Sequence, residues 1–353
     1  MLAMGTSPGG SADKFRRGLL AYLDTHVVNL VFYENSDHLA DETDSSESKA
    51  TNMDIFQAEM TARHFEGQCF VLNSKLFGLP QSRRRFYVVL LKSDSTDVID
   101  YSHRSISDMF HTLKILSQVC QKSPCPLKDI LLPDTDVLVS SELLRRTSLS
   151  HAKVDPNRSW IKEHQKLYQS LRLSWGVEPP SPGTSKSPWF ATLTPMQRST
   201  LTLNQHKLLM SMPKSFTASG QGDAGKRVPR LAIDINPSVG RLSTSTLDDG
   251  MEISPCILPQ QILWLHLPSE RIMLGYEAML LQGWPVMLVT DDAMVSNQLY
   301  QDLAGNGVSL PVMLALVMST FRAVSWAQES TGQCPATQEE VESVFALLAS
   351  LHG

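Results

Sequence analysis

Glu34 is the first residue of this sequence whose type and position suggest chemistry. It follows Val27–Tyr33, a nearly continuous apolar run that predicts a strand buried on both faces. Ligands of open α/β sheets bind at the carboxyl ends of such strands. A carboxyl group in apolar surroundings has a raised pKa and can hold a proton for donation. The alternative is a strand-end glutamate that faces solvent.

Three arginines follow Gln81 and Ser82 in a predicted turn between two strands, as Arg83, Arg84 and Arg85. If the second strand begins early, Arg83 and Arg85 project from the same face of it. Two guanidinium groups on one face suit phosphate groups or the edges of bases. A solvated basic turn is the alternative.

Gly305, Asn306 and Gly307 precede a strongly apolar stretch that predicts a helix. The free N–H groups at the start of that helix would suit a carboxylate or a phosphate. An ordinary turn before a core helix is the alternative.

Several other kinds of chemistry are excluded. The five cysteines are odd in number, irregularly spaced and without a C-x-x-C pair, so we expect neither a disulfide framework nor a zinc site. The same cysteine usage indicates a reducing compartment. The ten histidines include no H-x-x-x-H pair, and we expect no metal. The G-x-G-x-x-G run Gly220–Gly225 follows no predicted strand and is interpreted as a loop.

The elements that would position these residues alternate between helix and strand. A helix is predicted from Ser11 or Asp13 and a second from Thr51 or Asn52, since these residues are good N-caps. Strands are predicted at Val27–Tyr33, Gln68–Asn73 and Arg85–Lys92. Strand, helix and strand at this spacing are typical of a parallel α/β sheet.

Length and charge limit the remaining possibilities. The chain has 353 residues, a length that favours two domains. Its net charge of −5 argues against a protein that coats nucleic acid by bulk charge. Charge is nevertheless uneven, with eight acids and one base in Phe32–Met60 and seven bases and three acids in Ser141–Arg172. No apolar run is long enough to span a membrane, and the first ten residues do not resemble a signal peptide.

Four segments, in order, resemble the closing motifs of the cytosine-5 DNA methyltransferases. Glu34-Asn35 is similar to the family's ENV motif, and FGLPQSRRR (77–85) to its FG-x-PQ-x-R-x-R motif. LLQGWP (280–285) is similar to LQGFP, and LAGNGVSLPV (303–312) to the final AGN-x-V-x-x-P-V motif.

The resemblance implies methyl transfer from S-adenosylmethionine to C5 of a cytosine flipped out of DNA, with a cysteine thiolate adding to C6. Glu34 would contact N3 and the exocyclic amine, Arg83 and Arg85 would steady the base, and Gln81 would contact nucleic acid. Asn306 and Gly307 would line the cofactor site. The resemblance also implies that 1–115 and 285–353 pack together.

This sequence departs from the family pattern in two places. It has no F-x-G-x-G cofactor loop, and no Pro-Cys motif precedes Glu34. Its two Pro-Cys pairs, Pro124-Cys125 and Pro255-Cys256, are out of register with that motif. We therefore expect an incomplete chain that is inactive alone, with the nucleophile and the cofactor loop located upstream of Met1, and with an exposed sheet edge.

The predicted fold class is α/β: a partial Rossmann-like methyltransferase sheet with an irregular, mostly β and loop target-recognition domain inserted. The expected boundaries are 1–115 for the second half of the catalytic domain, 116–269 for target recognition, and 270–353 for the closing motifs and a returning helix. Basic residues of the middle region are the predicted nucleic-acid contacts, namely Arg145, Arg146, Arg158 and Lys162.

Two other functions stay open. One is a catalytically inactive, methyltransferase-like module that binds DNA or partners a complementary half or a complete enzyme, with Trp160 and Tyr168 among the basic residues of its DNA face. The other is a tRNA cytosine-5 methyltransferase. We expect no membrane association and no secretion, and a nuclear location if the source is eukaryotic or a cytoplasmic one otherwise.

Overall fold

The computed structural model describes residues 11–36, 51–149, 159–174, 187–211, 232–236, 244–248, 251–265, 270–285 and 296–327. The acidic stretch 40–50, the G-x-G-x-x-G run Gly220–Gly225 and Arg158 lie outside the described residues.

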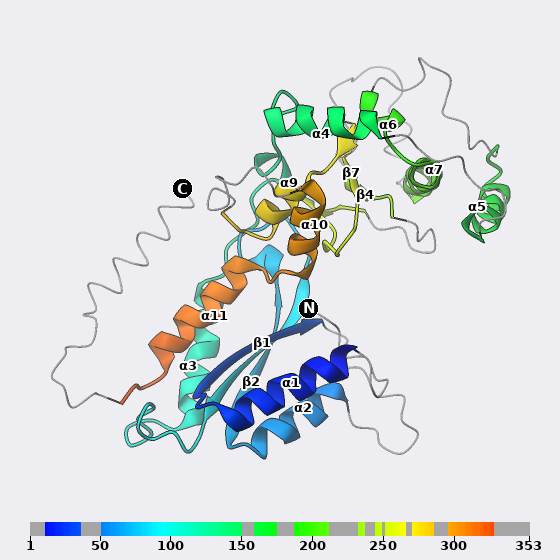
Figure 1. The fold of residues 1–353 in the computed structure, drawn as a ribbon. Coiled ribbons are helices and arrows are strands. Elements are labelled where there is room, and N and C mark those ends of the chain that lie inside the picture. Colours follow the sequence, from blue (N-terminus) through cyan, green and yellow to red (C-terminus); the bar gives the residue numbers. More distant parts are fainter. Residues whose placement is uncertain are drawn as a thin grey trace.

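The lower part of the molecule in Figure 1 contains the longest strands. Its elements are α1 (Ser11–Thr25), β1 (Leu30–Ser36), α2 (Asn52–Thr61), β2 (Phe65–Asn73), β3 (Arg84–Lys92), α3 (Ile106–Val119) and α11 (Leu310–Ala323). The predicted cap of α2 is confirmed, because the Thr51 hydroxyl accepts from the Asp54 N–H while the Asp54 carboxylate accepts from the Thr51 N–H.

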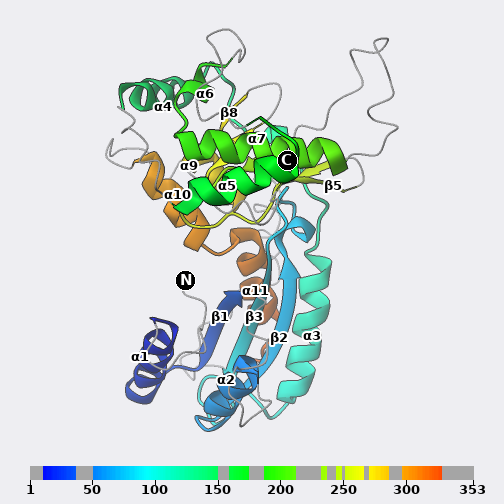
Figure 2. The same ribbon diagram turned by 90° about the vertical axis from the view of Figure 1, so that its right-hand side faces the viewer.

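The upper part combines helices with short strands (Figures 1 and 2). The helices are α4 (Val137–Ser148), α5 (Ser159–Ser170), α6 (Pro188–Ala191), α7 (Pro195–Ser211), α9 (Gly275–Leu281) and α10 (Asn297–Asn306). The strands are β4 (Ala232–Asp234), β5 (Thr246–Asp248), β6 (Met251–Ile253), β7 (Leu263–Leu265) and β8 (Arg271–Ile272).

The main sheet has the order β1-β3-β2. β3 is antiparallel to both neighbours, so β1 and β2 run in the same direction but do not pair. The α/β class is confirmed, whereas the prediction of parallel neighbours is wrong here. The physical reason is the short connection between β2 and β3, residues 74–83, which cannot make the crossover that a parallel pair requires.

Helices cover both faces of this sheet (Figure 2). On one face, Leu19, Leu20 and Leu23 of α1 pack with Phe56 and Met60 of α2 around a cluster that includes Tyr33 and Val88. On the other, α3 and α11 pack on β2 and β3 around a cluster that includes Leu113, Val89 and Leu316. The second cluster brings residue 316 against residues 70–113, so the implied return of the C-terminal part to the N-terminal part is confirmed for α11.

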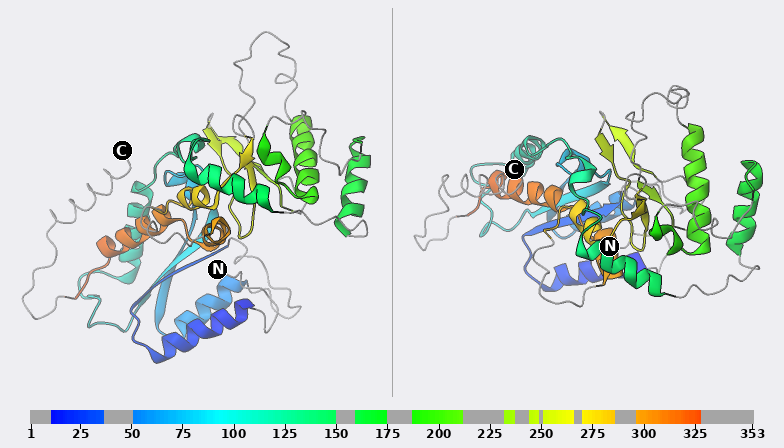
Figure 3. Two further views of the ribbon diagram at one scale, coloured as in Figure 1. Left: turned by 45° about the horizontal axis from the view of Figure 1, so that its top comes forward. Right: turned by 90° about the horizontal axis from the view of Figure 1, so that it is seen from above.

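The middle region differs from its prediction. Between 116 and 269 the described residues contain four helices as well as short strands, so this region is not mostly β and loop. Apolar residues dispersed among Pro, Ser and Thr hold part of this region in a core: Trp189, Leu193 and Leu201 pack against Ile233 and Trp264. α5 and α7 lie at the outer end of the molecule (Figure 3). β7 is hydrogen-bonded to β8, so one small sheet spans the predicted boundary at 269.

No single helix in the described ranges is long and apolar enough to cross a membrane. The bent pair α10 and α11 passes the test of length and composition together, with 43° between the two helices. Both helices place side chains in the protein's own core, which is what an apolar core helix does.

A tight turn directly after α9 packs against the start of α11. Gly283 has φ +79°, a conformation that residues with a Cβ adopt only at a cost, and a Cβ there would lie 2.5 Å from Pro311 Cδ. The neighbouring side chains hold the loop after α10, because Gln282 donates to the Ala304 carbonyl and Trp284 to the Val308 carbonyl. The turn therefore fixes where the end of α10 and the 307–309 loop lie.

Gly283→Ala is expected to lower the free energy of unfolding by about 2–4 kcal/mol, from backbone strain and the clash with Pro311. Urea denaturation followed by circular dichroism measures it. Gly18→Ala is the matched control, since Gly18 lies in α1 with nothing within 4 Å of a Cβ. Equal stabilities for the two variants would contradict this account of the turn.

Candidate functional site

Glu34 lies near the carboxyl end of β1, at the end of the sheet that faces α10 (Figure 1). It pairs in register with Tyr87 of β3, and Ser36 pairs with Arg85. Because β3 runs in the opposite direction, its first residues lie beside the last residues of β1. The sheet thus brings Glu34 and the arginine cluster together, which the family resemblance implied and a parallel pair of strands would not have done.

The Glu34 carboxylate is an unusual buried group. Its side chain is 1% exposed, and neither carboxylate oxygen has a hydrogen-bond partner. Oε1 lies 3.5 Å from Arg85 Nε and 4.0 Å from Arg83 Nη2. Burial raises the pKa of Glu34, and the two guanidinium groups oppose this only in part. The solvent-facing alternative is therefore wrong, and the role of Glu34 as a proton-holding carboxyl group stays a prediction.

Glu34→Gln is expected to stabilise the fold at about pH 8 but not at about pH 4. The folded pKa is raised above the ordinary 4.5, so the wild-type protein loses stability as the pH rises through the interval between the two values. Glutamine stays neutral and does not incur this loss. Thermal midpoints at the two pH values measure the effect. Glu66→Gln, at an exposed position of β2, is the control, and a midpoint difference independent of pH would contradict the prediction.

Arg83 connects β3 to two distant segments. Its guanidinium donates to the Ile257 carbonyl at 3.0 Å, to the Gly307 carbonyl at 2.9 Å and to the Gly305 carbonyl at 3.5 Å. The residue is 2% exposed. Arg83 therefore holds the final motif and the 255–257 segment against the start of β3, which makes it a positioning residue.

Arg85 is freer than Arg83. Its side chain is 14% exposed, and its Nη1 donates only to the adjacent Arg84 carbonyl. Its Nη2 donates to Cys256 Sγ at 3.2 Å, and Arg83 Nη1 also approaches this sulfur, at 3.5 Å. Of the two arginines, Arg85 is the better placed to contact a base held at Glu34.

Gln81 does not occupy the position predicted for it. Its side chain is 0% exposed and its amide has no hydrogen-bond partner. The cause is the pairing of its backbone with 254, since the Ser82 N–H donates to the Ser254 carbonyl and the Ser254 N–H to the Pro80 carbonyl. Gln81 therefore cannot contact nucleic acid in this structure.

Asn306 and Gly307 also differ from expectation in their local structure. Asn306 is the last residue of α10 and Gly307 its C-cap, whereas α11 begins at Leu310, so the glycines do not open a helix. The exposed Asn306 amide donates to the Asp302 carbonyl, and the Gly307 carbonyl accepts from Arg83. Their assignment to the cofactor stays a prediction.

The predicted nucleic-acid contacts of the middle region lie apart from Glu34, on α4 and α5. Arg145 and Arg146 both pair with Glu142, at 2.6 and 2.8 Å. Lys162 is exposed on α5, but Tyr168 is 3% exposed and cannot stack on a base. Their role as a nucleic-acid surface stays a prediction.

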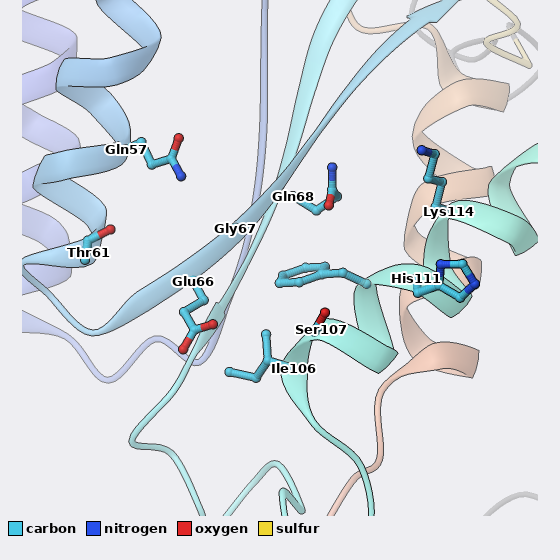
Figure 4. Close-up of a pocket in the computed structure, with 10 residues that line it drawn as sticks. Gln57, Thr61, Glu66, Gly67, Gln68, Ile106, Ser107, His111 and Lys114 are labelled. Atoms are coloured by element: carbon cyan, nitrogen blue, oxygen red, sulfur yellow. The ribbon is translucent and has the colours of Figure 1, made fainter.

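A cleft of roughly 450 Å³ lies elsewhere, between α2, β2 and α3 (Figure 4). Polar side chains such as Gln57, Glu66 and His111 line it, and none of the predicted site residues does. Within the described part of the chain, no group of three or more His, Cys, Asp or Glu side chains could hold a metal ion.

Two neighbours of Glu34 were not predicted. Tyr87 has a fully buried hydroxyl without a partner, and burial raises its pKa well above the usual range. Cys256 lies against both arginines. Its Pro-Cys pair is visible in the sequence, but no local pattern places it 171 residues away in the chain, beside Arg85.

Comparison with protein families gives one match. A profile described as C-5 cytosine-specific DNA methylase matches residues 20–322. This range includes Glu34, the arginine cluster and the final motif. No curated protein matches the sequence.

Solved structures similar to this chain include three methyltransferases. The Schizosaccharomyces pombe Dnmt2 methyltransferase is 10% identical, with a TM-score of 0.42, covering 91% of this chain and 76% of that one. A mutant of Spodoptera frugiperda DNMT2 is 12% identical, with a TM-score of 0.34 and coverages of 86% and 70%. Entamoeba histolytica methyltransferase EhMeth is 11% identical, with a TM-score of 0.37 and coverages of 88% and 71%.

Proposed function

This chain belongs to the C-5 cytosine-specific DNA methylase family, and we propose that it recognises a flipped-out cytosine in DNA for methylation at C5 with S-adenosylmethionine as methyl donor. The observation that carries the proposal is the buried Glu34 carboxyl group, which lies beside two arginines but accepts no hydrogen bond. A flipped base leaves the stack and enters a pocket where its Watson–Crick edge is read.

When its carboxyl group is protonated, Glu34 matches the Watson–Crick edge of cytosine. The carboxyl O–H donates to N3, and the other oxygen accepts from the exocyclic amine. Proton transfer to N3 withdraws electron density from the ring, which favours addition of a thiolate to C6. Arg85, one of whose N–H groups already lies 3.5 Å from Glu34, would hold the orientation of base and carboxyl group.

The described residues do not by themselves enclose a site for S-adenosylmethionine. The Asn306 amide is engaged with the Asp302 carbonyl, and the Gly307 carbonyl with Arg83. The sequence also contains no F-x-G-x-G loop. We therefore assign no step to the methyl donor from these residues.

The proposal assigns the nucleophile to none of the described residues, since no Pro-Cys pair precedes Glu34 in this sequence. In the described residues β1 has a strand partner only on its β3 side, so its other edge is open to a further strand.

Binding to duplexes with one mismatched base tests the proposal without turnover, because a mismatched base is easily flipped. The chain is expected to bind a mismatched cytosine about tenfold more tightly than a mismatched thymine, because only cytosine can take the Glu34 proton on N3 and then donate from both N3 and its amine to the carboxylate. Fluorescence anisotropy measures both affinities, and tRNA serves as the competing substrate class.

Glu34→Ala should remove the preference for cytosine, and Glu66→Gln, at an exposed position, should retain it. Equal affinity of the wild-type chain for the two mismatches would refute the proposal. Tighter binding to tRNA than to every duplex would favour the RNA substrate instead.

A further inference from the structure

The sulfur of Cys256 lies between two cations. Arg85 Nη2 donates to Sγ at 3.2 Å and Arg83 Nη1 at 3.5 Å. The thiol itself is directed to the Ile257 carbonyl at 3.6 Å. Reactive cysteines are found in such surroundings, because cationic donors stabilise the thiolate, which is the nucleophilic form.

The other described cysteines lack these surroundings. Burial raises the pKa of Cys69 to about 11 and also raises that of Cys125, so both are kept as thiols. Cys120 ends α3 and, like Cys256, is partly exposed. Among the cysteines that the structure describes, only Cys256 accepts hydrogen bonds from arginine.

A second feature of the same cluster suggests that an additional group fits there. Both oxygens of Glu34 are buried and accept no hydrogen bond, although Oε1 lies near the two guanidinium groups that contact Sγ. The charged and titratable groups with interactions at the sulfur are Arg83, Arg85 and Tyr87. A hydroxyl group on the sulfur would lie beside the two guanidinium groups that also approach Glu34.

We propose that Cys256 is a peroxide-reactive thiol, oxidised to a sulfenic acid in the Glu34 cluster. The thiolate attacks one oxygen of hydrogen peroxide, so an S–O bond forms and the O–O bond breaks. Sulfur loses two electrons, peroxide gains them, and the departing hydroxide takes a proton to become water. The product is the Cys–SOH group, which places one new oxygen beside Arg83 and Arg85.

Site-resolved labelling of the full chain tests the proposal. The protein is treated with hydrogen peroxide in the presence of a sulfenic-acid-specific dione probe, and mass spectrometry quantifies the label on each cysteine. Cys256 is expected to react about tenfold faster than Cys120, Cys69 or Cys125. A rate no greater than that of Cys120 in the wild-type protein overturns the proposal, and this comparison needs no variant.

A pair of variants tests the role of the arginines. Arg85→Gln should bring the Cys256 rate down toward that of Cys120, whereas Arg84→Gln, at the neighbouring exposed position, should leave it unchanged. Labelling of Cys120 in the same sample reports any loss of fold. Cys256 reacting equally fast in both variants would also overturn the proposal. Because the readout involves neither nucleic acid nor methyl transfer, it is independent of the proposed function.

Discussion

Glu34→Gln is expected to lower the rate of methyl transfer by about 10²- to 10⁴-fold while changing nucleic-acid affinity by about twofold at most. The glutamine amide can donate to N3 of cytosine and its carbonyl can accept from the exocyclic amine, so recognition survives. It cannot transfer a proton, so the addition to C6 loses its acid. Glu34→Ala removes both functions and should lose affinity for a flipped cytosine as well as turnover.

The measurement is transfer of a labelled methyl group under single-turnover conditions, in a preparation of this protein that shows methyl transfer. The pH profile adds a second test: burial raises the Glu34 pKa, and the rate should fall as the pH rises through that raised value because the acid form is lost. Glu66→Gln should retain the wild-type rate and profile. Full activity of Glu34→Gln would remove Glu34 from the chemistry.

The cluster around Glu34 could be predicted only where local patterns determine position. The apolar run before Glu34 and the strand after Arg83 are visible in the sequence, whereas the antiparallel pairing that puts their ends together was not predicted. Thr51 and Asp54 form a capping box that could be predicted from residue types alone. α11 could be predicted because its apolar content reflects a core position.

The remaining parts of the site depend on contacts between distant segments. The burial of Gln81 follows from pairing with residue 254, and the contacts of Arg83 reach residues 257, 305 and 307. No periodicity within one segment encodes such contacts. The same limit explains the middle region, where loop-forming residues between helices concealed the apolar positions that pack around Trp189 and Trp264.

Arg83 and Arg85 are separated in the chain by one exposed residue, Arg84. The two differ in burial and in their hydrogen-bond acceptors, and this difference separates a role in the fold from a role in chemistry. Arg83 is 2% exposed and donates to carbonyls of Ile257, Gly305 and Gly307. Without it these carbonyls lose a cationic donor, and the 305–307 loop loses its link to β3. Arg85 donates mainly to its neighbour's carbonyl and to Cys256.

Arg83→Ala is therefore expected to lower the free energy of unfolding by about 3–5 kcal/mol, the usual cost of removing one partner from a buried charged network. Arg85→Ala should cost about 1 kcal/mol or less, because its side chain is partly solvated and its acceptors are few. Arg84→Ala, at the exposed position between them, should cost nothing measurable. Urea denaturation of the three variants gives the ranking directly.

The same three variants should rank differently in cytosine recognition. Arg85→Ala should reduce the preference for a mismatched cytosine, since Arg85 Nε lies 3.5 Å from Glu34 Oε1.

Arg83→Lys should recover less than half of the stability lost in Arg83→Ala, because one ammonium cannot reach carbonyls on two segments as a planar guanidinium does. If Arg85→Ala proved as destabilising as Arg83→Ala, the division between a positioning and a catalytic arginine would be wrong.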